Sequence, residues 1–139
     1  MKIYFGHSRI TYNTQMELDA IWVILLRYPE CQIVNPNIPE HQNDCMASIK
    51  GDKTPGKEIG YFLKLTDDCH IGCFFQYYPG KWSAGSAAEA NYMLESGKNI
   101  YQIDIINKTL TPILAPVEAY TFKETLDKLV SHGIREYIV

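Results

Sequence analysis

Short apolar segments alternate with segments of helical spacing along this chain, and this alternation constrains the fold more than any other feature. Residues 2–6 form an apolar run that ends in glycine, and residues 32–34 form a second run before a proline turn. Residues 69–76 are nearly continuously apolar, as the buried strands of parallel sheets are. Residues 99–106 predict a further strand, and residues 135–139 predict a strand at the sheet edge.

Segments of helical spacing occupy the intervals between these strands. Thr14 and Glu17 form a capping-box pattern, which predicts the start of a helix. The apolar residues that repeat at helical spacing before Pro29 ends this run are Leu18, Ile21, Trp22, Leu25 and Leu26. Further helices are predicted over residues 42–49, 58–65, 87–96 and 121–132, the last of them capped by Thr121 with Glu124 and ended by Gly133.

Strands that alternate with helices predict the α/β class. We expect a doubly wound, mostly parallel sheet of about five strands with helices on both faces, as in flavodoxin-like and Rossmann-like folds. The 139 residues fit one domain, residues 1–139, and contain no internal repeat. Residues 35–56 are polar, contain three prolines and give the least regular pattern.

Charge and hydropathy exclude several classes of partner. The formal net charge is −3 and no cluster of Lys and Arg occurs, whereas proteins that bind nucleic acid polymers neutralise phosphates with a basic face. No apolar run reaches the roughly 20 residues that span a bilayer, so no membrane partner is expected. The first nine residues turn polar too early for a signal peptide, and a cytoplasmic location is expected.

The four cysteines predict neither a metal site nor a disulfide framework. Strand alternation over residues 69–76 directs Cys69 and Cys73 to one face and His70 to the other, which divides any zinc site. Cys31 and Cys45 have no ligand pattern near them, and no secretory signal accompanies the four thiols. We therefore expect small buried thiols, no metal and no cofactor.

Two loops lie where a doubly wound sheet binds its ligand. In such sheets the ligand sits outside the carboxyl ends of the strands, where the strand order reverses. One loop follows the first strand, and the other follows the third strand and leads into the helix that carries Glu89. The candidate residues for substrate or phosphate binding on these loops are Gly6, His7, Ser8, Arg9, Ser83, Gly85 and Ser86.

These residue types suit an anion. Gly85 and Ser86 open a helix whose free N–H groups and dipole favour negative charge. Arg9 carries a planar fork that binds phosphate through two hydrogen bonds, and His7 is a candidate contact to a phosphate or a base. Each of these features also occurs widely outside phosphate sites.

Glu89 has two interpretations from the residues alone. A carboxylate in this crevice could attack an anomeric carbon or stabilise an oxocarbenium ion. Ser86 and Glu89 also have the spacing of a capping box, which makes Glu89 a helix cap.

Aromatic residues precede this helix and also have two interpretations. Tyr77, Tyr78 and Trp82 could stack on a base or ribose, or they could form an apolar lid or a subunit contact. Asp68 is expected to be a structural residue at the start of the third strand. His41, His70 and His132 follow no partner pattern.

Three motifs resemble the nucleoside 2-deoxyribosyltransferase family. They are IYFG at the end of the first strand, the aspartate in TDDCHIGCFF, and GSAAEANYMLESGK, which follows the pattern G-[ST]-x-x-E-x-x-Y-x-x-x-x-GK. The resemblance implies that Glu89 is the nucleophile that takes the sugar from the base and that Tyr4 orients its carboxylate by a hydrogen bond. Ser83, Gly85 and Glu89 are most similar to the branch of nucleoside 5′-monophosphate N-hydrolases, in which the serine and a loop such as residues 6–9 hold the 5′-phosphate.

The resemblance implies an N-glycosidase that cleaves or transfers the base–sugar bond of a nucleoside 5′-monophosphate, in a homodimer or larger homo-oligomer. An alternative is a non-catalytic binder of a nucleotide or an ADP-ribose-like ligand in the same crevice. The aromatic loop before the helix and a missing aspartate support this alternative, and a third interpretation is a purely structural oligomer in which Ser86 and Glu89 only cap a helix. Three departures from the family pattern bear on the substrate. His7 lengthens the first loop, the aspartate that the transferases carry near Ser83 is missing, and Asn91 replaces a small residue.

Overall fold

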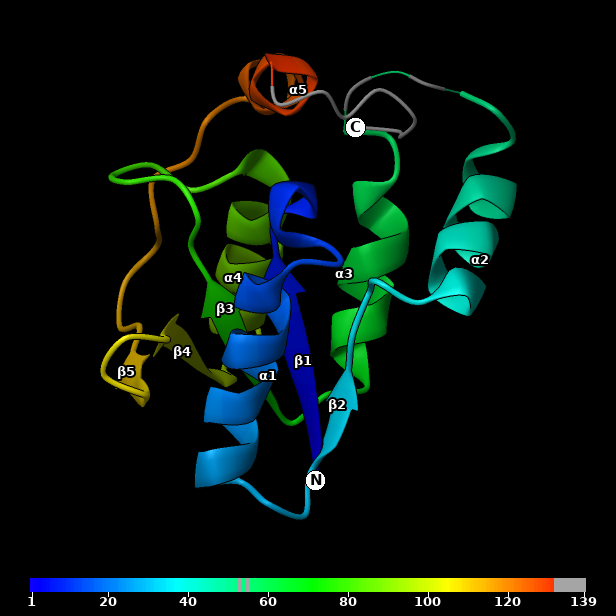
Figure 1. Ribbon diagram of the computed structural model, residues 1–139. Helices are drawn as coiled ribbons and strands as arrows, with labels where there is room; N and C mark the ends of the chain where they lie inside the picture. The colour runs from blue at the N-terminus through cyan, green and yellow to red at the C-terminus, as the bar shows by residue number, and fades with distance from the viewer. Residues whose placement is uncertain (53, 55, 132–139) are drawn as a thin grey trace.

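The protein forms a five-stranded sheet with helices on both faces, which confirms the predicted α/β class (Figure 1). The computed structural model describes residues 1–52, 54 and 56–131. The strands are β1 (Lys2–His7), β2 (Gln32–Val34), β3 (Ile71–Phe75), β4 (Asn99–Asp104) and β5 (Thr109–Pro112), in the spatial order β2-β1-β3-β4-β5. The first four are parallel, and β5 is antiparallel to β4. The strand predicted over residues 135–139 lies outside the described residues.

The helices are η1 (Arg9–Thr11), α1 (Gln15–Arg27), α2 (Pro39–Ile49), α3 (Ile59–Asp67), α4 (Ala84–Glu95) and α5 (Phe122–Ser131). The capping box predicted for α5 is confirmed, because Thr121 and Glu124 exchange hydrogen bonds of 2.9 and 3.1 Å. The predicted end of this helix at residues 132 and 133 lies outside the described residues. Among the described residues, no helix has the length and apolar character to cross a bilayer.

Two predictions around the third strand are wrong. The strand begins at Ile71, and Asp68 follows the last turn of α3, so Asp68 is a helix-end residue and not a strand-start residue. Cys69 therefore precedes the alternation and packs with α4, whereas Cys73 packs with α1 on the opposite face of the sheet. Both thiols are buried, and all four cysteines are free.

Strand β5 was missed by the sequence analysis, which left residues 109–118 without an element. It forms a hairpin with β4 through a turn in which Lys108 has a φ of 57°. The segment TLTP carries one apolar residue, Leu110, which packs on the α1 side of the sheet, so its local pattern did not predict a strand.

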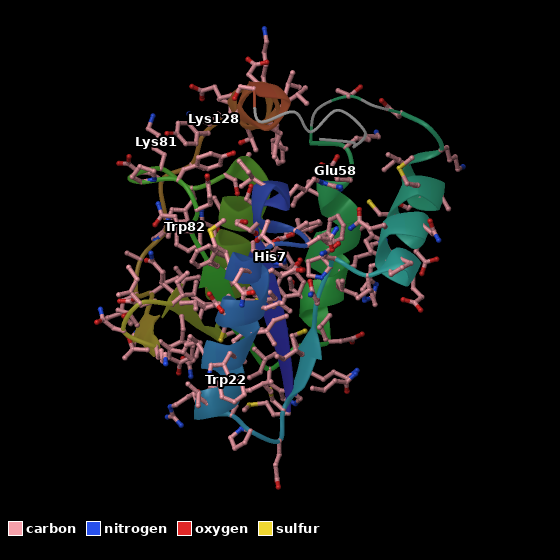
Figure 2. All side chains as sticks on the ribbon, in the orientation of Figure 1. His7, Trp22, Glu58, Lys81, Trp82 and Lys128 are labelled. Carbon is pink, nitrogen blue, oxygen red and sulfur yellow. The ribbon has the colours of Figure 1, made fainter. Side chains whose placement is uncertain are left out.

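Helix α1 covers one face of the sheet, and α3 and α4 cover the other (Figure 1). The capping box predicted at the start of α1 forms only in part. Thr14 accepts from the Glu17 N–H at 3.4 Å, but the Glu17 carboxylate accepts from the Asn13 N–H instead of returning to Thr14. The core side of α1 is formed by Ala20, Val23 and Ile24, and Ile21 of the predicted apolar repeat packs against it. Three other members of that repeat, Leu18, Trp22 and Leu26, are exposed (Figure 2).

Candidate active site

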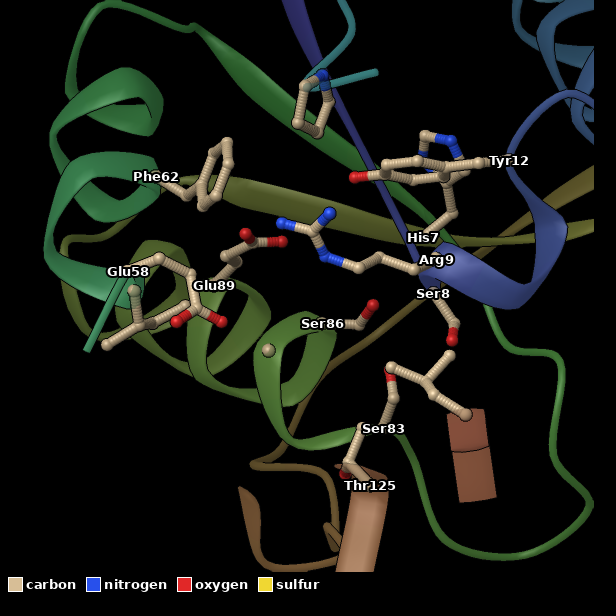
Figure 3. A pocket seen from close by; sticks show the side chains of 14 residues that line it. His7, Ser8, Arg9, Tyr12, Glu58, Phe62, Ser83, Ser86, Glu89 and Thr125 are labelled. Atoms are coloured by element: carbon tan, nitrogen blue, oxygen red, sulfur yellow. The ribbon is translucent and has the colours of Figure 1, made fainter. Parts of the chain in front are cut away.

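A cavity opens at the carboxyl end of β1, beside the start of the helix that follows β3, where the sequence analysis expected the ligand (Figure 3). It encloses about 510 Å³ when its open mouth is included. Helix α5 and the starts of α3 and α4 surround it together with the loop after β1. The residues that line it are His7, Ser8, Arg9, Tyr12, Pro36, Glu58, Ile59, Phe62, Ser83, Gly85, Ser86, Glu89, Thr125 and Leu129.

Glu89 lies inside this cavity and is not a helix cap. Helix α4 begins at Ala84 with Ser83 as its N-cap residue, so Glu89 belongs to the second turn and Ser86 to the first. The capping interpretation of Ser86 and Glu89 is therefore wrong. The Glu89 side chain is only 6% exposed, although carboxylates are seldom buried without a specific reason.

Gly6 and Tyr4 place the end of β1 directly against Glu89. A Cβ atom at Gly6 would come within 2.3 Å of the Phe74 ring and 3.3 Å of Glu89 Oε1, so this close approach requires glycine. The Tyr4 hydroxyl is fully buried and has no hydrogen-bond partner of standard geometry among the described residues. It lies close enough to Glu89 to stabilise the carboxylate form by donation.

Burial dominates the ionisation of Glu89. Desolvation raises the pKa of its carboxyl group to about 8, although the Tyr4 hydroxyl and the positive charge of Arg9 act in the opposite direction. The negative charge of Glu58 raises the pKa further. Among the described residues, Tyr4 and Arg9 are the groups that favour the carboxylate form needed for nucleophilic attack.

Hydroxyl and N–H groups gather at one end of the cavity. Ser83 and Ser86 are buried, and the Ser86 Oγ atom has no hydrogen-bond partner among the described residues. The first N–H of α4, that of Ala84, donates to the Thr125 Oγ1 atom at 2.9 Å. Helix geometry leaves the N–H groups of Gly85 and Ser86 without acceptors in their own helix, so this end suits an anion.

Ser8 faces this end from the loop after β1, and the neighbouring Arg9 also lines the cavity but points toward Glu89 (Figure 3). The Ser8 hydroxyl lines the cavity and also accepts from the Ile10 N–H at 3.4 Å. The Arg9 guanidinium extends toward Glu89, where it packs at 5.8 Å from the centre of the Tyr12 ring and donates to Gln42 Oε1 at 3.1 Å. The structure thus brings together the two loops that the sequence analysis paired.

His7 borders the cavity, but its ring is used inside the protein. The ring stacks on Phe5 at 3.9 Å, and its Nε2 atom lies 2.7 Å from Glu17 Oε2. Its Nδ1 atom lies 3.2 Å from the Phe5 carbonyl oxygen, so both ring nitrogens are engaged. Asn37 donates to both oxygens of Glu17. His7 therefore fixes the start of the Ser8–Arg9 loop, and its ring lines the cavity with both nitrogens already engaged inside the protein.

Glu58 is a second buried carboxyl group that the sequence analysis treated only as the start of a helix. It lines the cavity on the side of Glu89 away from Ser8 and Ser83, it is 5% exposed, and its Oε2 atom has no hydrogen-bond partner among the described residues (Figure 3). Burial raises its pKa to about 7. A glutamate at a helix start is common, so no pattern in the sequence signalled this role.

Tyr77, Tyr78 and Trp82 are not among the residues that line the cavity. Trp82 is 4% exposed and packs on Phe74 in the core beneath α4. Tyr77 and Tyr78 pack edge to face, and Tyr78 also contacts Tyr120. The aromatic groups at the cavity are instead Tyr12 and Phe62. Within the described residues, no group of three or more His, Cys, Asp or Glu is placed to hold a metal ion.

Removing the Glu89 carboxyl group is expected to stabilise the protein at alkaline pH. Below the ordinary pKa of a carboxyl group, Glu89 is protonated in both the folded and the unfolded chain. Between that pH and about pH 8, Glu89 keeps its proton only in the folded chain. The free energy of unfolding therefore falls as pH rises through this range. Glu89→Gln escapes this loss, which amounts to a few kcal/mol because one pKa unit corresponds to about 1.4 kcal/mol.

Urea unfolding at pH 5 and pH 9 measures this difference. Glu124→Gln is the control, since hydrogen bonds from Thr121 lower the pKa of Glu124, and its carboxylate therefore stabilises the fold at both pH values. Its removal should destabilise the protein by the same small amount at pH 5 and pH 9. An equal gain from Glu89→Gln at both pH values would show that Glu89 is ionised in the folded protein.

The chain was compared with protein-family models, with curated proteins and with solved structures, and none of them matches it.

Proposed function

We propose that the protein is an N-glycosidase that cleaves the base–sugar bond of a nucleoside 5′-monophosphate, with Glu89 as the nucleophile. The observation that carries the proposal is the position of Glu89, which is buried in a cavity between an anion-binding end and a second buried carboxyl group. The motif resemblance implies the same role for Glu89 and Tyr4.

The two ends of the cavity suit the two ends of such a substrate. Ser83, Ser86 and Arg9 would hold the 5′-phosphate through hydroxyl, N–H and guanidinium groups. Phe62 and Glu58 lie beyond Glu89, where an aromatic face and a proton donor suit a flat heterocycle. The ribose then lies beside Glu89 with its C1′ atom near the carboxyl group.

The reaction has two steps. In the first step, the Glu89 carboxylate forms a bond to C1′, the C1′–N bond breaks, and the base leaves with the bonding electron pair and a proton from the Glu58 carboxyl group. In the second step, the Glu58 carboxylate takes a proton from water, the water oxygen bonds to C1′, and the C1′–Glu89 bond breaks. Configuration at C1′ is retained, and a second base in place of water gives transfer.

A binder without turnover is the second candidate. The observation that favours it is the protonation of Glu89, because burial raises its pKa to about 8 and a protonated carboxyl group does not attack C1′. A bound substrate must therefore favour the carboxylate for the glycosidase proposal to hold.

The proposal can be tested by incubating the protein with a panel of nucleosides and their 5′-monophosphates. Free bases are then measured by chromatography. The monophosphates are expected to release base, and the unphosphorylated nucleosides are expected to react far more slowly. Addition of a second free base distinguishes transfer from hydrolysis. Tight binding of a monophosphate without base release would support the binder and contradict the glycosidase.

Arg9→Ala is expected to raise the KM for the monophosphate by about 10- to 100-fold, because a hydrogen bond to a charged group contributes about 1.5–3 kcal/mol. The KM of the corresponding nucleoside should change much less, since it offers no phosphate. The exposed Arg27→Ala, at the end of α1, is the matched control. An equal rise in KM for both substrates would contradict the phosphate assignment of Arg9, whereas an equal fall in kcat would reflect the effect of Arg9 on the pKa of Glu89.

A further inference from the structure

The outward face of α1 carries an apolar stripe that the fold leaves exposed. Leu18, Trp22 and Leu26 follow one another at intervals of four residues and are 60%, 56% and 51% exposed. Residues four apart lie one above another on a helix, so the three side chains form a continuous line. Figure 2 shows Trp22 on this helix, away from the cavity at the carboxyl ends of the strands.

This stripe lies on the less covered face of the sheet. Among the described residues, α1 is the only helix that contributes to the core on its face, whereas α3 and α4 share the other face. A helix that packs on a sheet alone needs one apolar side, and its solvent side is usually polar. Helix α1 is apolar on both sides, which indicates that its outer side is covered by another surface.

The stripe is complementary to a second copy of itself. If two α1 helices pack antiparallel about a two-fold axis at Trp22, Leu18 of each copy lies opposite Leu26 of the other, and the two Trp22 side chains meet at the axis. The same surface then serves both partners, as the interfaces of symmetric dimers require.

The charges beside the stripe favour the same arrangement. Asp19 stands near the start of α1, where it accepts a hydrogen bond from Gln15 at 2.8 Å, and the exposed Arg27 is the last residue of the helix. In the antiparallel pair, each Arg27 lies within about 3 Å along the axis of Asp19 in the other copy, at a rise of about 1.5 Å per residue. The helix dipoles also oppose each other, which is favourable.

The exposed area fits the centre of a dimer interface. The three side chains present on the order of 300 Å² of apolar surface, comparable with the largest apolar patch of a typical monomer. A stable interface buries about 800 Å² on each partner and surrounds an apolar centre with a polar rim. The partly exposed Leu25 extends the centre, and Gln15, Asp19 and Arg27 supply the rim.

We propose that the protein forms a symmetric homodimer in which the Leu18–Trp22–Leu26 stripe of α1 packs antiparallel against the same stripe of a second copy. The interface lies away from the candidate active site, so the dimer does not depend on the proposed function.

The interface can be tested by sedimentation equilibrium. The protein concentration should run from about 1 to about 100 µM, the order of magnitude expected for the Kd of such a dimer. The wild type is expected to reach twice the 15.9 kDa mass of one chain, and Trp22→Glu is expected to remain monomeric. Ile106→Glu is the control, because Ile106 is 87% exposed on the turn between β4 and β5 and should leave the dimer intact. A monomeric wild type, or a dimeric Trp22→Glu protein, would overturn the proposal.

A charge reversal tests the antiparallel register. Asp19→Arg alone places like charges together and should weaken the dimer about 3- to 10-fold, as exposed ion pairs contribute up to about 1 kcal/mol. The double variant Asp19→Arg with Arg27→Asp exchanges the charges and should restore the wild-type affinity. Failure of the double variant to regain affinity would exclude this register even where the stripe is the interface.

Discussion

Glu89→Gln is expected to lower the rate of base release from a nucleoside 5′-monophosphate by at least about 1,000-fold, equivalent to roughly 4 kcal/mol of activation free energy. Glutamine fills the same space beside Gly6 but cannot form the bond to C1′. The Kd for the monophosphate should change little, because the anion-binding groups of Ser83, Ser86 and Arg9 remain.

Glu95→Gln is the matched control, since Glu95 ends the same helix and is exposed. Its base release should equal that of the wild type. Mass spectrometry after reaction with a slow 2′-fluoro substrate should find a sugar phosphate on the peptide that contains Glu89. Rapid base release by Glu89→Gln would remove Glu89 from the mechanism and leave the cavity to another nucleophile.

Much of the fold could be predicted because it follows from local patterns. The apolar runs of β1 and β3 and the capping residues of α5 act within a few residues of the chain, and the structure retains each of them. The start of α4 at Ala84 was missed, because Ala84 and Gly85 precede a pattern in which Ser86 and Glu89 mimic a cap. Because the helix was predicted to begin about one turn too late, Glu89 fitted both a helix cap and a residue of the site.

Only the part of the candidate site that comes from the loop after β1 and from α4 was predicted from the sequence. The sequence paired the Ser8–Arg9 loop with the start of α4, since strand order and helix ends locate both. Glu58 and Phe62 come from α3, whose approach to Glu89 depends on how the polar segment before it folds. The orientation of His7 toward Glu17 likewise depends on a contact between separate elements. Such tertiary contacts leave no periodic trace in the sequence.

Glu58→Gln is expected to lower the rate of base release by about 100- to 1,000-fold for ordinary bases, within the range of general acid–base contributions. Glutamine keeps the size of the side chain but has no carboxyl proton for the departing base. A 7-methylpurine nucleotide carries a cationic base that leaves without a proton, so the same variant should slow its first step much less. Glu40→Gln, an exposed change on α2, is the control and should affect neither substrate.

The pH dependence distinguishes a proton donor from a residue that only shapes the cavity. Glu58 and Glu89 are buried at the same cavity, and the negative charge of Glu58 raises the pKa of Glu89, so the pair loses its protons in two steps. The reaction needs one proton on the pair, which predicts a bell-shaped profile of kcat/KM with its maximum between about pH 7 and 8. Glu58→Gln should lose the alkaline limb, and its rate should instead rise to a plateau as Glu89, whose pKa is about 8 beside Glu58, loses its proton. The opposite result is a variant that keeps the full bell shape, or that releases ordinary and 7-methylated bases with equal losses in rate. In either case Glu58 only shapes the cavity, and another group must donate the proton to the base.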